Sequence, residues 1–406
     1  MTRGRKKVLA MLLVFFMVFL GTGCGGSSGS SSAGKETAKA KEPIRLGGIF
    51  DITGGTGDVG APYAEGVKDY IKYVNAHGGV NGRQINLIDI DYAYQIPKAL
   101  EAYKKLTTQD KVVAILGWGT GDTEAMVPLI TKDKIPFMSA SYSEHLLELS
   151  THPYNFLIAQ SYSDQLRMVL KWIKDNWKDT SRKPRVAFIY NDTGFGLSPI
   201  ADGEKYAAEI GVELVDKVNV PLTALDATSQ LTNMQKKNPD FAIIQETAMA
   251  TATVLKDAKR LKIPTKFIGL NWAFDEKVIK LAGEAAEGYM GVVPFAFASD
   301  DLPALKPLKE ATAAVGKKWE DRTQKYIQGW ATAMVMVEGL RRAGDDLTGE
   351  GIKKALEGLQ NFDTGGLSAP VSFSSTSHRG STQAKLYEIK GGKFVPLTGW
   401  MKAPGR

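Results

Sequence analysis

Residues 44–91 read IRLGGIFDITGGTGDVGAPYAEGVKDYIKYVNAHGGVNGRQINLIDID, and this stretch decides the fold class of the chain. It begins and ends with apolar runs, 44–50 and 85–91, that predict β-strands. Between them, apolar side chains recur at helical spacing over 63–74, with charged residues on the opposite face. The glycine-rich residues 78–82 end this helix and turn the chain toward the second strand. The stretch is therefore predicted to be one strand–helix–strand unit.

The same alternation of strands and helices continues along most of the chain. Apolar runs between turn residues predict further strands at 112–118, 135–140, 185–190, 212–220, 241–245 and 266–270. Parallel strands separated by helices of this length need right-handed crossovers, which build doubly wound sheets. From residue 44 on, about 360 residues fit two such sheets better than a single one. We therefore predict an α/β fold with two doubly wound parallel-sheet lobes.

The pattern breaks near residues 154–163 and then starts again, which marks a boundary between the two lobes. After the second series, a strand is predicted at 288–297 and helices at 305–319, 323–343 and 351–359. This return to helices indicates that the chain crosses back to the first lobe, and several crossings between two lobes form a hinge. We assign the two lobes, in that order, to residues 44–160 plus 292–362 and to residues 161–291 plus 363–406.

The N-terminus has the pattern of an export signal. Positive charges precede an apolar run over residues 8–20, and small residues then lead to Cys24. A run of this length spans about 20 Å as a helix, too short for a hydrocarbon core of roughly 30 Å. The pattern resembles a bacterial lipobox in which Gly21 stands in place of the usual leucine. We therefore expect a lipoprotein signal peptide over 1–23, lipid modification of Cys24 and a flexible Gly/Ser-rich tether over 24–43. The alternative is an ordinary secretory signal followed by an incidental free cysteine.

Composition and motifs argue against several classes of function. The formal charge is +7, but the body after the tether contains no basic run, so binding of nucleic acid is not indicated. Without a cysteine beyond position 24, the body has neither a disulfide nor a thiolate metal site. The four histidines show no metal-binding spacing, and neither a nucleophile-elbow nor a P-loop motif occurs. We therefore expect no enzyme activity, no metal and no cofactor.

The loop after the first strand reads GTGDVG over residues 55–60, which matches the G-x-G-x-x-G pattern of dinucleotide-binding loops. The acidic residues at the end of the next strand, Asp89 and Asp91, follow about 30 positions later instead of about 20. Glycines are also common in any loop between a strand and a helix. An ordinary loop is therefore favoured over a nucleotide site.

A second glycine-rich loop, GWGTGDT at residues 117–123, follows the third predicted strand and leads into a helix. Free N–H groups at a helix start, together with the Thr120 hydroxyl, can hold an anion such as a ligand carboxylate. The alternative is that Asp122 or its neighbour only caps the helix. Ser141 and Ser143 leave the adjacent strand and offer further hydroxyl groups beside this loop.

Five segments, in this order, resemble the solute-binding proteins of ABC importers, in the group that binds leucine, isoleucine, valine and related hydrophobic amino acids. They are DITG at 51–54, VNAHGGVNGR at 74–83, GWGT at 117–120, IPFMSAS at 135–141 and NDTGFG at 191–196. The resemblance covers roughly residues 44–366. It implies a type I periplasmic-binding-protein-like fold, in which two α/β lobes joined by three crossings trap a solute in the cleft between them. It also implies delivery to a membrane permease and no catalytic activity.

The resemblance also places ligand contacts on this chain. Thr120 falls where the family has a hydroxyl group that binds the ligand carboxylate. Ser141 and Ser143 match the residues that hold the carboxylate and the ammonium. Phe195 replaces a tyrosine at the rim of the second lobe, which keeps the aromatic face and loses the phenol.

One position departs from the family. Leucine-binding members place a glutamate for the ammonium where this chain has Asn271, and a neutral amide holds a cation less well than a carboxylate does. Glu246, at the end of the neighbouring strand, is the candidate replacement; otherwise the ligand lacks an amine. A flat or apolar solute is favoured by four aromatic residues in cleft-facing loops, whose alternative role is ordinary packing. They are Trp118, Tyr142, Phe195 and Trp272.

Two classes of function follow from these patterns. The first is an extracytoplasmic, lipid-anchored and monomeric protein, in the periplasm or on the outer cell surface. It captures a small carboxylate-bearing ligand, a hydrophobic amino acid or a related apolar or aromatic acid, and delivers it to the membrane subunits of an ABC permease. The alternative is a ligand-sensing receptor or an exported enzyme on the same scaffold, since a fold alone does not define a function. The absence of a paired acid, base or nucleophile favours the first class.

Overall fold

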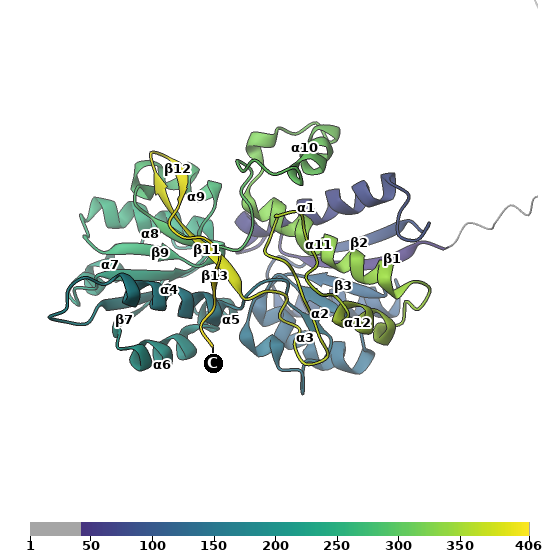
Figure 1. Ribbon diagram of the computed structural model, residues 1–406, viewed down its shortest axis with the longest axis horizontal. Helices are drawn as coiled ribbons and strands as arrows, with labels where there is room; N and C mark the ends of the chain where they lie inside the picture. Colours follow the sequence, from purple (N-terminus) through teal and green to yellow (C-terminus); the bar gives the residue numbers. More distant parts are fainter. Residues whose placement is uncertain (1–41, 406) are drawn as a thin grey trace, which may run out of the picture. The chain divides into compact units, whose positions relative to one another are not determined.

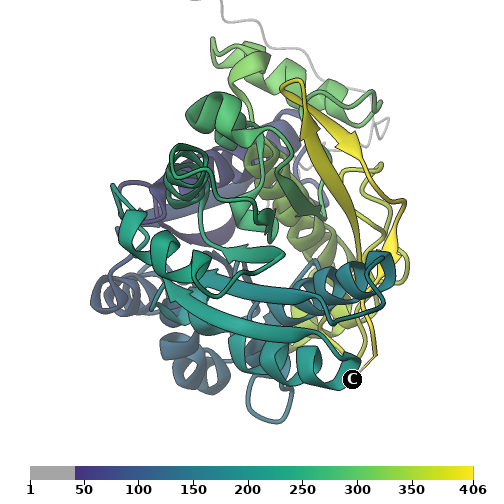
Figure 2. The same cartoon turned by 90° about the vertical axis from the view of Figure 1, so that its left-hand side faces the viewer.

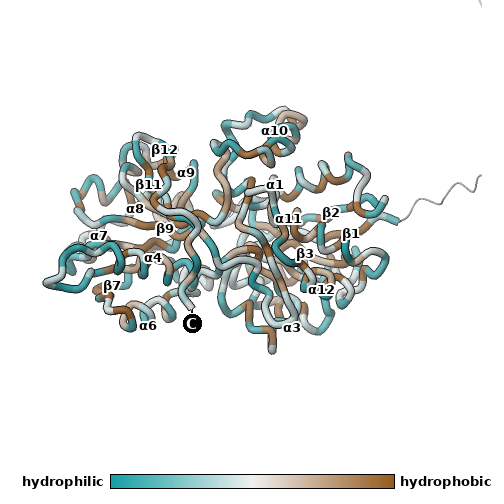
Figure 3. Tube along the Cα trace, in the orientation of Figure 1, coloured by the Kyte–Doolittle hydropathy of each residue, from teal (hydrophilic) through white to brown (hydrophobic). Residues whose placement is uncertain are grey.

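Two mainly parallel sheets organise residues 42–405, the part of the chain that the computed structural model describes. The predicted signal peptide, Cys24 and nearly all of the tether lie outside the described residues. Helices lie on both faces of each sheet (Figure 1). The hydrophobic residues concentrate on the strands and on the helix faces that cover them (Figure 3). Among the described helices, none combines the length and the apolar character that a membrane span requires.

The first sheet is fully parallel and has the strand order β2-β1-β3-β4-β5. Its strands are β1 (Ile44–Phe50), β2 (Ile85–Asp91), β3 (Ala114–Gly117), β4 (Phe137–Ser139) and β5 (Asn155–Phe156). Its main helices are α1 (Gly57–Ala76), α2 (Ile96–Thr108), α3 (Thr120–Asp133), α11 (Gln324–Ala343) and α12 (Gly349–Glu357). The prediction of a doubly wound parallel lobe is confirmed, because this strand order reverses direction between β1 and β3.

The second sheet repeats this order as β7-β6-β8-β9-β10 and then adds antiparallel strands at its edge. Its strands are β6 (Arg185–Tyr190), β7 (Glu213–Asn219), β8 (Phe241–Gln245), β9 (Lys266–Gly269), β10 (Met290–Val293), β11 (Gln383–Lys390), β12 (Lys393–Pro396) and β13 (Met401–Lys402). Its helices are α4 (Tyr162–Asn176), α5 (Gly194–Leu197), α6 (Ile200–Ile210), α7 (Thr228–Gln235), α8 (Ala248–Arg260) and α9 (Glu276–Ala282). The edge strands β11 and β12 are yellow in Figure 2. Both lobes predicted from the sequence are therefore present.

The helix predicted at 305–319 is shorter in the structure, where α10 covers Leu305–Ala314. Gly316 has a φ of +71° and ends the helix. The N–H of Gly316 donates to the carbonyl of Ala313, and that of Lys317 donates to the carbonyl of Thr312. These two bonds form a Schellman motif, which stops a helix regardless of the apolar pattern beyond it.

The hydrogen bonds of the hinge place two of the crossings differently from the sequence assignment. Residues 292 and 293 belong to β10 and hence to the second sheet. Residues 361–380 bond back to the first lobe: the N–H of Phe373 donates to Leu359, and that of Gly380 donates to Leu157. We therefore propose that the second crossing follows β10 and that the third follows Gly380 rather than residue 362.

Helices α1 and α11 cross with their backbones in close contact. A β-carbon on Gly66 would lie 2.0 Å from the carbonyl oxygen of Tyr326, and one on Gly329 would lie 2.0 Å from that of Tyr63. The backbone of each helix thus packs directly against a glycine of the other helix. This crossing fixes the start of α11, which follows the hinge, against the helix that carries the first cavity loop.

Candidate functional site

A cavity lies between the two lobes, at the carboxyl ends of both sheets. It contains about 260 Å³ of space not filled by protein atoms, and part of this space is open to solvent. In each lobe several lining residues follow the two strands at which the strand order reverses, β1 and β3 in the first sheet and β6 and β8 in the second, which is where open α/β sheets bind ligands. The lining residues are Thr56, Val59, Tyr94, Trp118, Gly119, Thr120 and Ala140 from the first lobe, and Tyr162, Phe195, Thr247 and Trp272 from the second.

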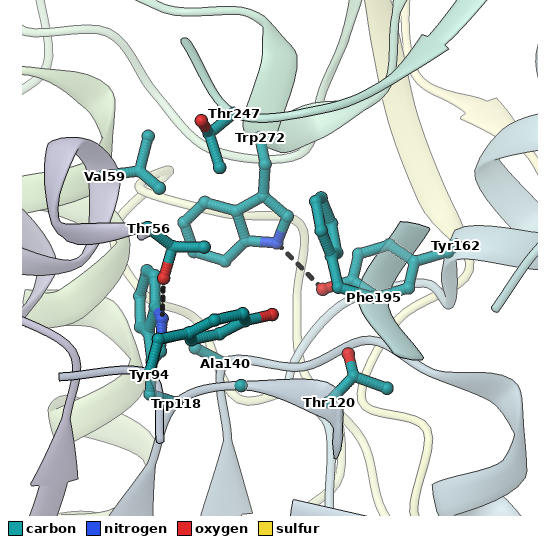
Figure 4. A pocket seen from close by; sticks show the side chains of 11 residues that line it. Thr56, Val59, Tyr94, Trp118, Thr120, Ala140, Tyr162, Phe195, Thr247 and Trp272 are labelled. Carbon is teal, nitrogen blue, oxygen red and sulfur yellow. Dashed lines mark hydrogen bonds between the residues drawn. The ribbon is translucent and has the colours of Figure 1, made fainter. Parts of the chain in front are cut away.

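Four of the predicted contacts line this cavity, and Figure 4 shows their side chains turned toward one another. Trp118 donates from its indole nitrogen to the Thr56 hydroxyl at 2.8 Å. Trp272 donates in the same way to the Tyr162 hydroxyl at 2.9 Å. Phe195 contacts the Tyr162 ring at 5.4 Å between centroids. The fourth is Thr120. The walls of the cavity are therefore mostly aromatic.

Thr120 is the first residue of α3, at the point where the sequence predicts either a hydroxyl site for an anion or a helix cap. The Thr120 Oγ1 lies 2.7 Å from the Ser141 Oγ. The Asp122 carboxylate accepts from the N–H of Gly119 at 3.2 Å and caps the helix. Burial raises the pKa of Asp122 to about 7. The Asp122 carboxylate caps the helix, and the Thr120 hydroxyl faces the cavity. A helix cap therefore does not exclude an anion site at the same helix start.

The remaining predicted residues are buried behind the wall. Ser141 does not line the cavity, but its hydroxyl bonds to that of Thr120, which does. The Tyr142 hydroxyl accepts from the Gln328 amide at 2.9 Å. Ser143 accepts from the hydroxyl of Ser198, in the second lobe, at 3.0 Å. Their contact with a ligand stays a prediction.

Glu246 is also fully buried and does not line the cavity. One carboxylate oxygen accepts from the Asn191 amide at 3.0 Å, and the other has no hydrogen-bond partner among the described residues. Burial raises the pKa of Glu246 well above its ordinary range, and the negative charges of Asp58 and Asp192 act in the same direction. Its proposed contact with a ligand ammonium therefore requires it to lose a proton in an apolar setting.

Asn271 holds its position through its backbone. Its N–H donates to the Gln165 side chain at 3.0 Å, and its carbonyl accepts from the Lys325 ammonium. The side-chain amide is buried and has no hydrogen-bond partner within residues 42–405. The Asn271 side chain therefore offers a ligand amine no acidic group.

The lobes touch directly beside the cavity. The carboxylate of Asp58, in the first lobe, accepts from the N–H of Met249 in the second lobe at 2.8 Å. Lys277 donates to the carbonyl of Asp58 at 2.9 Å. Burial raises the pKa of the Asp58 carboxyl to about 6. These bonds join the start of α1 to the starts of α8 and α9, so the structure shows the cleft in a closed arrangement.

Sequence reasoning missed six side chains of the wall: Thr56, Val59, Tyr94, Ala140, Tyr162 and Thr247. Two of them belong to the GTGDVG loop, which was interpreted as an ordinary loop. Tyr94 has a φ of +56°, a backbone conformation that no local pattern indicates. Tyr162 begins α4 directly after Ser161, and the Ser161–Asp164 capping box was the available signal. Within the described residues, no cluster of His, Cys, Asp or Glu is arranged to hold a metal ion.

Two α/β lobes that enclose a small aromatic cavity agree with the class of substrate-binding proteins that the sequence resembles. Residues 43–393 match the sequence profile of the family described as periplasmic binding protein, and the chain belongs to this family. It is similar to the Leu/Ile/Val-binding protein of Escherichia coli (strain K12), with 21% identity over 75% of this chain and 81% of that protein. The Leu/Ile/Val/Thr/Ala-binding protein of Pseudomonas aeruginosa is 21% identical over 75% of this chain and 80% of its own length.

Solved structures agree with this assignment. A branched-chain amino acid ABC transporter protein from Thermus thermophilus with bound valine has a TM-score of 0.84 and 29% identity, and the match covers 89% of this chain and 97% of that one. An ABC transporter substrate-binding protein from Aeropyrum pernix has a TM-score of 0.83 and 27% identity, over 90% of this chain and 97% of that one. The chain is thus an extracytoplasmic substrate-binding protein of ABC transport, and not an enzyme.

Proposed function

We propose that this protein captures a small carboxylate-bearing solute with an apolar or aromatic body in the interlobe cavity and delivers it to an ABC permease. A hydrophobic amino acid and a related amine-free acid both belong to this class. The observation that carries the proposal is the cavity itself, in which the start of a helix and the Thr120 hydroxyl lie among walls of aromatic rings. Relatives whose names specify leucine, isoleucine and valine binding support the same solute size and polarity.

The proposal includes attachment to the membrane through a lipid on Cys24 and a monomeric state. The pattern of residues 1–43 supports the attachment, because an export signal, a cysteine and a Gly/Ser-rich tether follow one another. The mass of the mature protein tests it. An N-terminus that starts elsewhere, or that carries no lipid, would contradict the attachment.

The carboxylate end of the solute is assigned to the start of α3. The amide N–H groups there carry partial positive charge, and the Thr120 hydroxyl adds a donor inside a closed cavity. We expect Thr120→Val to weaken solute binding by about 1.5–3 kcal/mol, the loss of a hydrogen bond to a charged group. Isothermal titration calorimetry measures this. Thr131→Val, at the other end of the same helix, is the matched control and should bind like the parent. Equal affinity of the Thr120→Val variant would place the carboxylate elsewhere.

The surroundings of the solute amine distinguish a hydrophobic amino acid from an amine-free acid. Among the described residues, none of the side chains that line the cavity carries a charge. An unpaired buried ammonium costs several kcal/mol, and burial favours the protonated, neutral form of Glu246. We therefore expect 4-methylpentanoate to bind at least as tightly as leucine, and Glu246→Gln to leave both affinities within a factor of about three.

Calorimetry with leucine and its deaminated analogue on parent and variant checks this expectation. A preference for leucine that falls tenfold or more in the Glu246→Gln variant would assign the ammonium to Glu246. That result would make the solute an α-amino acid. The substitution Glu246→Gln keeps the size of the side chain and an oxygen that can accept the hydrogen bond from Asn191. We therefore expect this variant to fold like the parent, so that a change in affinity reports on the lost charge.

A further inference from the structure

Trp272 belongs to the second lobe, but its indole ring packs among aromatic rings of the first lobe. The ring centroid lies 4.9 Å from that of Trp118, 6.3 Å from that of Tyr142 and 6.5 Å from that of Tyr63. The ring of Tyr142 is nearly parallel to it, at 14°. Figure 4 shows the indole in the middle of the cavity, between the residues of the two lobes. The side chain therefore occupies part of the interlobe space itself.

This ring is held at both ends. Its nitrogen donates to the Tyr162 hydroxyl at 2.9 Å. Its backbone lies in the short 3-10 turn Asn271–Ala273, which Gln165 and Lys325 fix through the backbone N–H and carbonyl of Asn271. A side chain tied at its tip and at its base keeps one orientation. The indole thus acts as a rigid wall of the cavity.

The size of the remaining space follows from this wall. In the closed arrangement the space that a water-sized sphere can reach beside this wall is only about 20 Å³, far below the range of about 300 to 1,000 Å³ for pockets that hold drug-sized ligands. The opposite wall, Trp118, is bonded to Thr56 of its own lobe and packs against Tyr63 there, so it belongs to the first-lobe core. Trp272 instead extends from the end of β9 into the gap. Its removal would enlarge the cavity without removing a part of either sheet.

We infer that Trp272 determines specificity by setting the largest solute that the closed cleft accepts. The inference rests on the proposed function, because it concerns the same cavity. It assigns the solute to small acids whose apolar body fits beside the indole, and it excludes long-chain acids and fused aromatic rings.

Calorimetry with a graded series of acids tests this role. The series runs from butanoate to decanoate and includes benzoate and 2-naphthoate. We expect the parent to bind the short members and benzoate and to bind decanoate and 2-naphthoate at least tenfold more weakly. Trp272→Ala should remove this difference, with at least a tenfold gain for the two large acids. The same difference in both proteins would overturn the inference.

Free indole provides a test that does not depend on the solute class. An apolar space opened by truncation binds a matching apolar molecule, so Trp272→Ala should bind indole and melt at a higher temperature in its presence, and the parent should not. If no acid binds either protein while indole binds only the variant, the proposed carboxylate function fails and the role of Trp272 stands. A folded variant that binds neither indole nor the large acids would show that the cleft closes over the gap, and the inference would be wrong.

Two further variants control for folding and for general effects. Trp272→Phe keeps an aromatic ring and should move the size limit in the same direction by a smaller step, so it replaces the alanine variant if that variant does not fold. Trp400→Ala removes an indole that is 42% exposed and lies outside the cavity lining. It should keep the parent's order of affinities, and a shifted order in this control would contradict a specific role for Trp272.

Discussion

Gly329→Ala is expected to lower the free energy of unfolding by about 3 kcal/mol or more, although it adds only a methyl group. The new carbon would lie 2.0 Å from the carbonyl oxygen of Tyr63 and 2.8 Å from its carbonyl carbon. Both atoms are backbone, so no side-chain rotation relieves the contact, and α1 and α11 must move apart. Urea denaturation followed by circular dichroism measures the loss.

Gly66, the second glycine at the crossing of α1 and α11, allows a double-variant test of the same contact. Its added carbon would meet the carbonyl of Tyr326 at the same helix crossing. Once one alanine has separated the helices, the second finds more room, so the double variant should lose less than the sum of the two single losses. Gly358→Ala is the control, since its added carbon finds only ordinary contacts from 3.5 Å. Additive losses, or a Gly329→Ala variant within about 1 kcal/mol of the parent, would contradict the direct backbone contact.

The sequence was sufficient for the fold because strand and helix patterns are local. The runs at 44–50, 85–91, 185–190 and 241–245 are strands with those bounds in the structure. The strand predicted at 288–297 is shorter, since the chain leaves the sheet after β10 to cross the hinge. Hydrophobic residues continue into the crossing because it is buried too: Phe295 is 1% exposed. Periodicity alone therefore does not show where a sheet ends and a buried hinge begins.

The candidate site was predictable only in part, and the reason is the direction of side chains. Residues that directly follow parallel strands meet at one edge of a sheet, so Trp118 and Trp272 could be placed near the cleft that the family resemblance implies. Whether a side chain then faces the cavity depends on its partners. Glu246 turns to Asn191, and Ser143 turns to Ser198 of the other lobe. Such partners come from distant parts of the sequence and leave no local signal.

Lys325 is the clearest case of a residue whose role the sequence did not indicate. It stands in the first turn of α11, where a lysine is usually exposed, yet it is fully buried. Its ammonium donates to the carbonyl of Asn271, to that of Phe274 at 3.3 Å and to the Gln324 side chain at 2.9 Å. It therefore ties a first-lobe helix to the second-lobe turn that carries the cavity wall.

We expect Lys325→Met to lower the free energy of unfolding by about 3–5 kcal/mol, the usual cost of removing one partner from a buried charged group. Methionine fills a similar volume, but it leaves two carbonyl groups without their donor and the buried Asp275 without the nearby positive charge. Solute affinity should fall as well, because the turn that orients Trp272 loses its anchor. Lys280→Met, on the exposed face of α9, is the control and should be nearly neutral.

The pH dependence separates the charge of Lys325 from its packing. Burial lowers the pKa of this lysine from 10.5 to about 8, while Asp275 and Glu276 oppose the shift. Between these two values the unfolded chain holds a proton that the folded protein has released, so the contribution of Lys325 to the stability of the parent should rise with pH from about 8 to 10.5. The Lys325→Met variant lacks this group, and the difference in unfolding free energy between the two proteins should therefore increase across that window. A difference that stays constant with pH would show that the ammonium is not penalised by burial.

A second substitution tests whether the loss arises from an unpaired charge. Asp275 caps α9 by accepting from the N–H groups of Lys277 and Val278, and asparagine can accept the same bonds. Adding Asp275→Asn to Lys325→Met removes the buried negative charge and keeps the cap. We expect the double variant to recover part of the stability lost by Lys325→Met, because two compensating charges are then absent together. A double variant that is less stable than Lys325→Met by the full cost of Asp275→Asn alone would show that the two groups do not interact. In that case the anchor of the turn would consist of the carbonyl bonds alone, and the stability of the closed cleft would not depend on the charge of Asp275.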